Sequence, residues 1–167
     1  LKWHHIYYLL AAFDLATVSM SLLLTHEILG IYRESVGENQ EWTARSGRFG
    51  DLAQLSSAVN APGNDVFASR DAEQESSRLE AALAQFDESV AINRSDLATN
   101  VDEEVSAPLS AALDRTQSAM ANMAAEARVI FRYFESDPQI AGQHMAAMDR
   151  HYAEVRGALD EVLRGVS

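Results

Sequence analysis

Apolar residues are distributed very unevenly along this chain. Residues 6–24 read IYYLLAAFDLATVSMSLLL and hold one charged side chain, Asp14, whereas the remainder is polar with apolar positions at regular intervals. A helix of this length extends about 28 Å at ~1.5 Å per residue, enough to cross the apolar core of a bilayer. Trp3, Tyr7 and Tyr8 stand at one end of it, where amphipathic rings favour the membrane surface. The pattern predicts a transmembrane helix within residues 1–24.

Two other interpretations of this segment stay open. A signal peptide ends at a small-residue cleavage site, whereas here the apolar run continues into the helical pattern THEILGIYRES. A buried core helix is the stronger alternative, because a carboxylate such as Asp14 costs about 2.5–3.5 kcal/mol at the centre of a membrane helix. In a membrane, Asp14 is either a tolerated neutral residue or a polar contact, with Thr17 or Ser21 of a neighbouring helix as its partner.

The charges that flank the segment predict its orientation. Lys2 precedes it and Glu27 follows it, which favours a cytoplasmic N-terminus under the positive-inside rule. The polar part then lies in the periplasm or outside the cell, anchored in the inner (cytoplasmic) membrane. Because the chain starts at Leu1 rather than Met, we expect further residues upstream.

Residues 25–167 divide into four helical stretches. Pro62 and Gly63 predict a first break, and a second break is rich in Asn, Ser, Asp and Thr and precedes Pro108, which we expect in the first turn of the next helix. Asp137 and Pro138 predict the third, as a cap followed by proline at the first helical position. The three expected breaks are Asn60–Asp65, Asn93–Ala107 and Ser136–Pro138.

Apolar side chains recur every three or four residues in these stretches, which predicts one narrow apolar seam on each helix. The first stretch is less regular and contains Gly30, Gly37, Gly47 and Gly50; these glycines either kink or fray the helix or permit close approach to a partner helix. The expected seams are Leu29, Tyr32, Val36, Phe49, Leu52 and Val59; Leu79, Leu83, Phe86 and Val90; Leu109, Leu113, Thr116, Met120, Met123, Ala127, Ile130 and Phe134; and Met145, Met148, Tyr152, Val155, Leu159, Val162 and Val166.

The four stretches have similar lengths. At ~1.5 Å per residue they form rods of roughly 45–54 Å, and matched amphipathic rods with short connections pack as an antiparallel bundle. We therefore predict an all-α, up-down-up-down four-helix bundle over residues 25–167, whose first helix continues the transmembrane helix. The fourth helix then returns to the membrane, so a second transmembrane segment is expected beyond Ser167 in a truncated receptor.

Composition narrows the possible functions. The chain has no cysteine, which removes disulfides, thiolate metal sites and thiol nucleophiles. Its net charge is −12, and such a surface repels nucleic acid and anionic headgroups. We expect no nucleic-acid partner.

Few residues suggest catalytic or metal chemistry. Neighbouring His4 and His5 cannot face one ligand on a helix, and His144 and His151 lie about 10 Å apart on theirs. Methionines at four seam positions are typical of a packed core, and the acidic run at residues 102–104 is typical of a solvated helix start. We therefore expect no metal, no cofactor and no enzymatic activity in this fragment, although a longer parent protein could carry a kinase or cyclase.

The layout of anchor, continuous first helix and three further helices resembles the sensory domains of bacterial transmembrane receptors, as in chemotaxis receptors, sensor histidine kinases and membrane diguanylate cyclases. The stretch VNAPGNDVF at residues 59–67, followed by Ser69, Arg70 and Asp71, resembles a turn in the input domains of some hybrid histidine kinases and cyclases. The resemblance implies a signal-sensing domain that transmits a helix shift across the membrane. It also implies a parallel homodimer in which helices one and four form the contact, with Gly37 and Gly47 allowing close approach.

Up-down topology places the first and third breaks together at the membrane-distal end. Donors gather there on Asn60, Asn64, Arg70 and Arg132, and Tyr133 adds an aromatic wall. Two arginines on an acidic domain can bind a carboxylate or another small anion. The alternative is that Arg70 and Arg132 pair with the neighbouring Asp71 and Glu135, and that the asparagines only serve the turn.

Three functions follow as hypotheses. The first is the sensing domain of a dimeric receptor, most simply a (hybrid) sensor histidine kinase, with a small anion or a periplasmic protein as ligand. The second is a membrane-anchored scaffold or assembly subunit that binds a protein partner. The third, an enzyme or cofactor carrier in a bundle core, has the least support.

Overall fold

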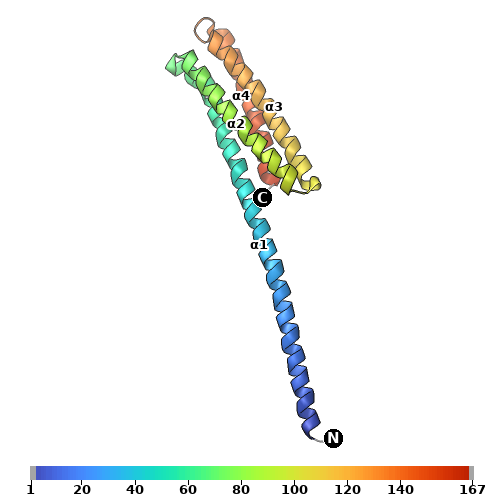
Figure 1. Cartoon of the computed structure of the whole chain (residues 1–167). Coiled ribbons are helices and arrows are strands. Elements are labelled where there is room, and N and C mark those ends of the chain that lie inside the picture. Colours follow the sequence, from blue (N-terminus) through green and yellow to red (C-terminus); the bar gives the residue numbers. More distant parts are fainter. Residues whose placement is uncertain (1–2, 166–167) are drawn as a thin grey trace. The chain divides into compact units, whose positions relative to one another are not determined.

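The computed structural model describes residues 3–165, and its regular elements in that range are α-helices (Figure 1). The chain divides into two compact units, one ending at Thr43 and one starting at Ala44, and the first helix contributes to both. The second unit contains the helical bundle. The helices are α1 (Trp3–Ser69), α2 (Ala72–Asn100), α3 (Glu103–Tyr133) and α4 (Pro138–Gly165). The predicted all-α four-helix bundle is confirmed, whereas the proposed domain boundary after residue 24 stays a prediction.

The core of the bundle follows the predicted seams. On α3 the expected positions from Leu109 to Ile130 are buried and Phe134 is half-buried. On α4, Met145 and Tyr152 are half-buried, and Val166 lies outside the described residues. The other buried seam positions are Leu79, Phe86 and Val90 on α2 and Met148, Val155, Leu159 and Val162 on α4. The methionines at 120, 123 and 148 are thus core residues.

Within the bundle, α1 has a more regular seam than the sequence suggested. Buried residues recur at alternating spacings of four and three, and Pro62 is buried beside this series. The members of the series are Arg45, Phe49, Leu52, Ser56, Val59, Gly63 and Val66. Because Arg45 and Ser56 are polar, the regular spacing is not visible when only apolar residues are considered. In the first unit, the expected seam residues Leu29, Tyr32 and Val36 are exposed instead.

The first break was predicted at the wrong place, because α1 continues through Pro62 and Gly63 to Ser69. Both residues are buried, and a Cβ on Gly63 would lie 2.5 Å from Met148 Sδ and 3.4 Å from Ala127 Cβ. The glycine therefore permits close approach to α3 and α4. An interior proline destabilises a helix by about 3 kcal/mol, and the burial of this part of α1 in the core outweighs that cost.

The true break is at Arg70 and Asp71. Arg70 has a left-handed backbone, with φ of 58°, and its N–H donates to the Val66 carbonyl at 3.0 Å. Asp71 then caps α2, because its Oδ1 accepts from the N–H of Gln74 at 2.9 Å. The chain reverses over these two residues.

The second break is shorter than predicted and the third is confirmed. Only Val101 and Asp102 separate α2 from α3, so Pro108 is the sixth residue of α3 and not part of its first turn. Helix α3 starts early because the Asp102 carbonyl accepts from the N–H groups of residues 105 and 106, and acidic residues 103 and 104 favour a helix N-terminus. At the third break, Asp137 Oδ1 accepts from the N–H groups of residues 139 and 140, and Pro138 is the first helical residue.

The N-terminal end of α1 is long and apolar enough to cross a membrane. Its most apolar window has no residue buried against another part of the described chain, unlike a core helix. Signal sequences share these properties. Lys2, on which the predicted orientation depends, lies outside the described residues.

Candidate functional site

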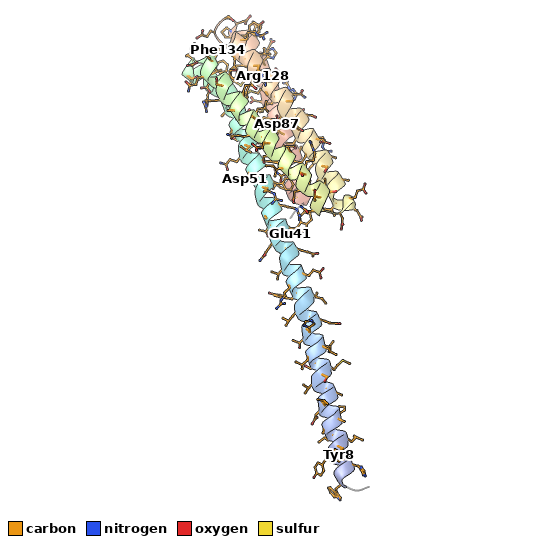
Figure 2. The ribbon with its side chains drawn as sticks, in the orientation of Figure 1. Tyr8, Glu41, Asp51, Asp87, Arg128 and Phe134 are labelled. Atoms are coloured by element: carbon orange, nitrogen blue, oxygen red, sulfur yellow. The ribbon has the colours of Figure 1, made fainter. Side chains whose placement is uncertain are left out.

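The end of α1 and the turn between α3 and α4 lie at the same end of the bundle. The rings of Phe67 and Phe134 meet edge to face, with centroids 6.4 Å apart, and Figure 2 shows Phe134 at that end. The contact joins the two regions that the sequence placed together. It leaves the polar side chains around it at the surface.

Of the five candidate ligand-binding residues, Arg70, Arg132 and Tyr133 lie where α1 and α3 end. Asn60 and Asn64 lie inside α1, and Asn60 is about 15 Å along the helix from Arg70 at ~1.5 Å per residue. Asn64 is exposed and its Nδ2 donates to the Asn60 carbonyl at 3.2 Å, while Asn60 Oδ1 is buried without a hydrogen bond. Arg70 and Arg132 are exposed, and Tyr133 is half-buried. Among residues 3–165, no ion pair joins Arg70 to Asp71 or Arg132 to Glu135. Both guanidinium groups therefore face solvent at the distal end.

A second polar cluster lies between α1 and α2 at the opposite end of the bundle, and sequence reasoning missed it. Asp96 Oδ2 accepts from Arg45 Nε at 2.8 Å and from Arg48 Nη2 at 2.6 Å, and Asp96 Oδ1 accepts from Asn100 Nδ2 at 2.8 Å. Arg45 is only 4% exposed. Two guanidinium groups on one helix thus share a single carboxylate oxygen on the next.

The Asp96 cluster combines strong pairing with incomplete hydrogen bonding. Burial is the largest effect on the pKa of Asp96 and raises it, but the hydrogen bonds from Asn100 and Arg45 and the charges of Arg45 and Arg48 together lower the pKa below its ordinary value. Arg48 Nε and Asn93 Oδ1 are buried without a hydrogen-bond partner. Buried polar atoms of this kind are costly, so this layer is polar and incompletely satisfied.

A smaller charged group lies near the distal end. Glu75 is 1% exposed, and its Oε2 accepts from Arg78 Nη1 at 2.6 Å. The same nitrogen donates to Asp65 Oδ2 at 3.0 Å. Arg78 therefore bridges the end of α1 and the start of α2.

Ion pairs on the surface connect α3 to its neighbours. Arg128 binds Glu80 of α2 through two hydrogen bonds, of 2.8 and 3.0 Å. This hydrogen bonding lowers the pKa of Glu80 and raises that of Arg128. On the other side of α3, Glu126 Oε2 lies 2.5 Å from His144 Nδ1 of α4. Exposed pairs contribute at most about 1 kcal/mol each to the free energy of unfolding. These contacts therefore matter more for the alignment of neighbouring helices than for stability.

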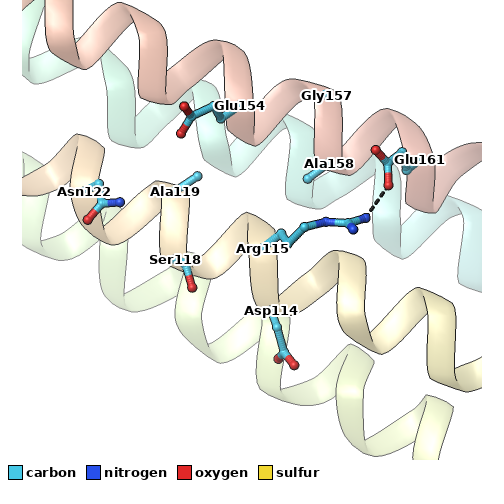
Figure 3. A pocket seen from close by; sticks show the side chains of 9 residues that line it. All are labelled: Asp114, Arg115, Ser118, Ala119, Asn122, Glu154, Gly157, Ala158 and Glu161. Atoms are coloured by element: carbon cyan, nitrogen blue, oxygen red, sulfur yellow. Dashed lines mark hydrogen bonds and ion pairs between the residues drawn. The ribbon is translucent and has the colours of Figure 1, made fainter.

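An open groove of about 540 Å³ runs between α3 and α4 (Figure 3). Arg115 reaches from α3 across it to Glu161 of α4. Asn122 and Glu154 lie at one end, and Gly157 forms part of the wall. A second hollow of about 440 Å³ adjoins it, lined in part by the same Arg115 and Glu161.

The other residues that the sequence singled out are Asp14 and the histidines. Asp14 is exposed on α1, and Thr17 Oγ1 donates to the carbonyls of Phe13 and Asp14 within the same helix. His151 pairs with Glu154 at 3.0 Å, and the side chain of His4 is not among those described. In the described part of the chain, no three His, Cys, Asp or Glu side chains lie close enough to hold a metal ion.

Comparison with protein-family models, with curated proteins and with solved structures gives no match for this chain. The fold is therefore that of a four-helix all-α protein without an assigned family. Any functional conclusion must come from the residues themselves.

Proposed function

We propose that this chain is the signal-sensing input domain of a dimeric membrane receptor, most simply a (hybrid) sensor histidine kinase. The observation that carries the proposal is the continuity of α1: one helix, Trp3–Ser69, contains both the apolar segment and the first helix of the bundle. A helix without a flexible joint can transmit an axial or rotational shift. A flexible linker would absorb it.

In this proposal the apolar segment of α1 anchors the chain in the inner (cytoplasmic) membrane, and the bundle lies in the periplasm or outside the cell. The exposed apolar side chains between Trp3 and Leu24 support anchoring, because an unpartnered surface of that size is unfavourable in water. Asp14 then contacts a polar group of a neighbouring membrane helix or is tolerated without such a contact.

The ligand site in this proposal is the distal end of the bundle. Exposed Arg70 and Arg132 supply guanidinium groups there, whereas the unpartnered Asn60 Oδ1 is an acceptor and contributes no contact to an anion. A small organic anion fits this chemistry. Binding shifts the helices only if the anion prefers one packed arrangement to the other.

Thermal shift against a panel of organic anions tests the ligand site. We expect at least one anion to raise the melting temperature of the wild type and to lose that effect in Arg70→Ala and Arg132→Ala. The exposed Arg156→Ala is the matched control and keeps the response. If no anion stabilises the wild type, or if both distal variants respond like the control, the distal site is wrong.

Dimerisation through α1 is the second part of the proposal. A Cβ added to Gly37 or Gly47 meets no atom within 4 Å, so these positions leave room for a second helix, as small residues do between membrane helices. Cysteines at both positions should cross-link the membrane-embedded chain as dimers. Monomers at both positions would contradict the dimer contact.

A membrane-anchored scaffold that binds a protein partner is the second candidate function, and the open groove between α3 and α4 favours it. The nucleotide sequence that follows the codon of Ser167 distinguishes the two. A second apolar segment followed by a signalling module supports the receptor, and a stop codon soon after Ser167 supports the scaffold.

A further inference from the structure

The groove between α3 and α4 has a shape that the packing of the bundle does not require. The two adjoining hollows extend along α3 from Val105 to Asn122, which is about 26 Å at ~1.5 Å per residue. A small molecule fills only part of such a length. An α-helix of about five turns matches this length, and it can lie along both hollows only if the exposed Arg115 side chain, which crosses the groove to Glu161, moves aside.

The walls of the groove are made of unusually short side chains. Ala111, Ser118 and Gly157 are exposed there, although exposed helix positions more often carry long charged residues. A Cβ at Gly157 would meet no atom within 4 Å, so the glycine is not needed for contact between α3 and α4. Short side chains allow another helix to approach closely.

The rim of the groove is acidic. Asp114, Glu154 and Glu161 line it against one guanidinium group, that of Arg115. The three carboxylates are paired with Arg94, His151 and Arg115, but their side chains remain 67%, 60% and 54% exposed. Exposed pairs are weak, so each carboxylate can accept a further cation.

We infer that this groove is a docking surface for a cationic amphipathic helix of a partner protein. The partner helix places small apolar residues against Gly157 and Ser118 and lysine or arginine residues against the acidic rim. A second copy of this chain is a poor occupant, because its own groove brings the same excess of carboxylates and like charges repel. The surface lies on α3 and α4 and does not depend on the distal ligand site.

The test uses the full chain in nanodiscs and a synthetic helical peptide of about 18 residues, long enough for five turns. One face of the peptide carries alanine and leucine, and the flanks carry lysine; the comparison peptide carries glutamate in place of lysine. Fluorescence anisotropy measures the dissociation constant. The lysine peptide should bind, more tightly at low salt, and the glutamate peptide should not.

Matched variants locate the binding. Gly157→Leu fills the groove and should weaken binding about tenfold, a loss of 1.4 kcal/mol. Gly142→Leu, on an exposed and equally open position of α4 outside the groove, should change it less than about twofold. Glu154→Gln with Glu161→Gln should weaken binding about tenfold, whereas Glu73→Gln with Glu88→Gln on α2 removes equal charge and should not.

Several outcomes would overturn the inference. These are no binding of the lysine peptide, equal binding of both peptides, or equal effects of the groove variants and their controls. Sedimentation of the wild type and Gly157→Leu completes the test: if the substitution dissociates the chain's own oligomer, the occupant is a second copy and the inference is wrong.

Discussion

Arg70 ends α1 in a backbone conformation that an arginine rarely adopts. With φ at 58°, its Cβ crowds the backbone, at a cost of roughly 1–2 kcal/mol that glycine avoids. The exposed side chain gains no ion pair with Asp71 in the described chain. The strain at Arg70 is therefore not offset by an ion pair with its neighbour.

Replacing Arg70 by glycine tests whether the left-handed backbone at this position lowers the stability of the fold. Arg70→Gly should raise the free energy of unfolding by about 0.5–1 kcal/mol, because the left-handed strain is lost and the greater freedom of glycine in the unfolded chain offsets part of the gain. Thermal unfolding should show a rise of about 2 °C or more. The control is Ser69→Gly, one residue earlier and still helical, which should lower the melting temperature. A lower melting temperature in both variants would contradict the claim that Arg70 is strained.

Asp96 makes the stability of the bundle depend on pH, and the direction of that dependence follows from its pKa. Its pKa is lower in the folded chain than the ordinary value of 3.8, so its contribution is fully present above the unfolded pKa. The contribution is lost as pH falls through the folded pKa. Acid therefore removes the link between α1 and α2 that Arg45 and Arg48 make with Asp96.

Asp96→Asn tests this at two pH values. At pH 7 the substitution should lower the free energy of unfolding by about 1–3 kcal/mol, because the buried charge of Arg45 loses a carboxylate. As the pH falls below the ordinary value of 3.8 and through the lower pKa of the folded state, the difference from the wild type should shrink, since the wild-type carboxyl becomes protonated. Urea unfolding measures both values, with exposed Asp51→Asn as the control. A difference that stays constant with pH would contradict the assignment.

The sequence predicted single-helix features at this scale but not the Asp96 cluster. The Asp137 cap could be predicted because a cap and its helix are neighbours in sequence. Arg45 and Asp96 are 51 residues apart, and their contact depends on how α1 and α2 are aligned. The only local signal was a four-residue spacing between Asp96 and Asn100.

At the scale of the element, the seams were predictable and the ends of the helices were less so. The spacing of apolar residues indicates which side chains of a helix are buried, and the buried residues form the seams of α2, α3 and α4. The break at Pro62 failed because local propensity was given more weight than packing: Gly63 touches α3 and α4, and that contact is invisible in the sequence of α1 alone.

Pro62 therefore lowers the stability of a helix that forms in spite of it. Pro62→Ala should raise the free energy of unfolding by about 1–3 kcal/mol, because the new N–H can donate to the carbonyl of Ala58 and the steric conflict disappears. Urea unfolding of the variant and of Ala61→Pro, which should be strongly destabilised, provides the comparison. A less stable Pro62→Ala would mean that the buried ring contributes more packing than the helix loses.

At the scale of the whole molecule, the four-helix bundle followed from matched lengths and seams, whereas its sites did not. Topology predicted that the end of α1 and the turn between α3 and α4 lie at the same end of the bundle, but the exposure and pairing of the side chains there depend on the packing of the helices. The groove between α3 and α4 could not be predicted, because the sequence does not show that short side chains such as Ala111 and Gly157 lie exposed on two facing helices. The function proposed above depends on the continuity of α1.

The central claim is that α1 crosses a membrane and continues into the sensing bundle. Spin labels at Ser19→Cys, inside the apolar segment, and at exposed Ser57→Cys, inside the bundle, test it in nanodiscs by electron paramagnetic resonance with oxygen and a water-soluble nickel complex as relaxants. Oxygen concentrates in lipid, so the account predicts that oxygen relaxes the label at 19 more strongly than nickel does, with the reverse at 57. Water-like relaxation at both positions would contradict the account.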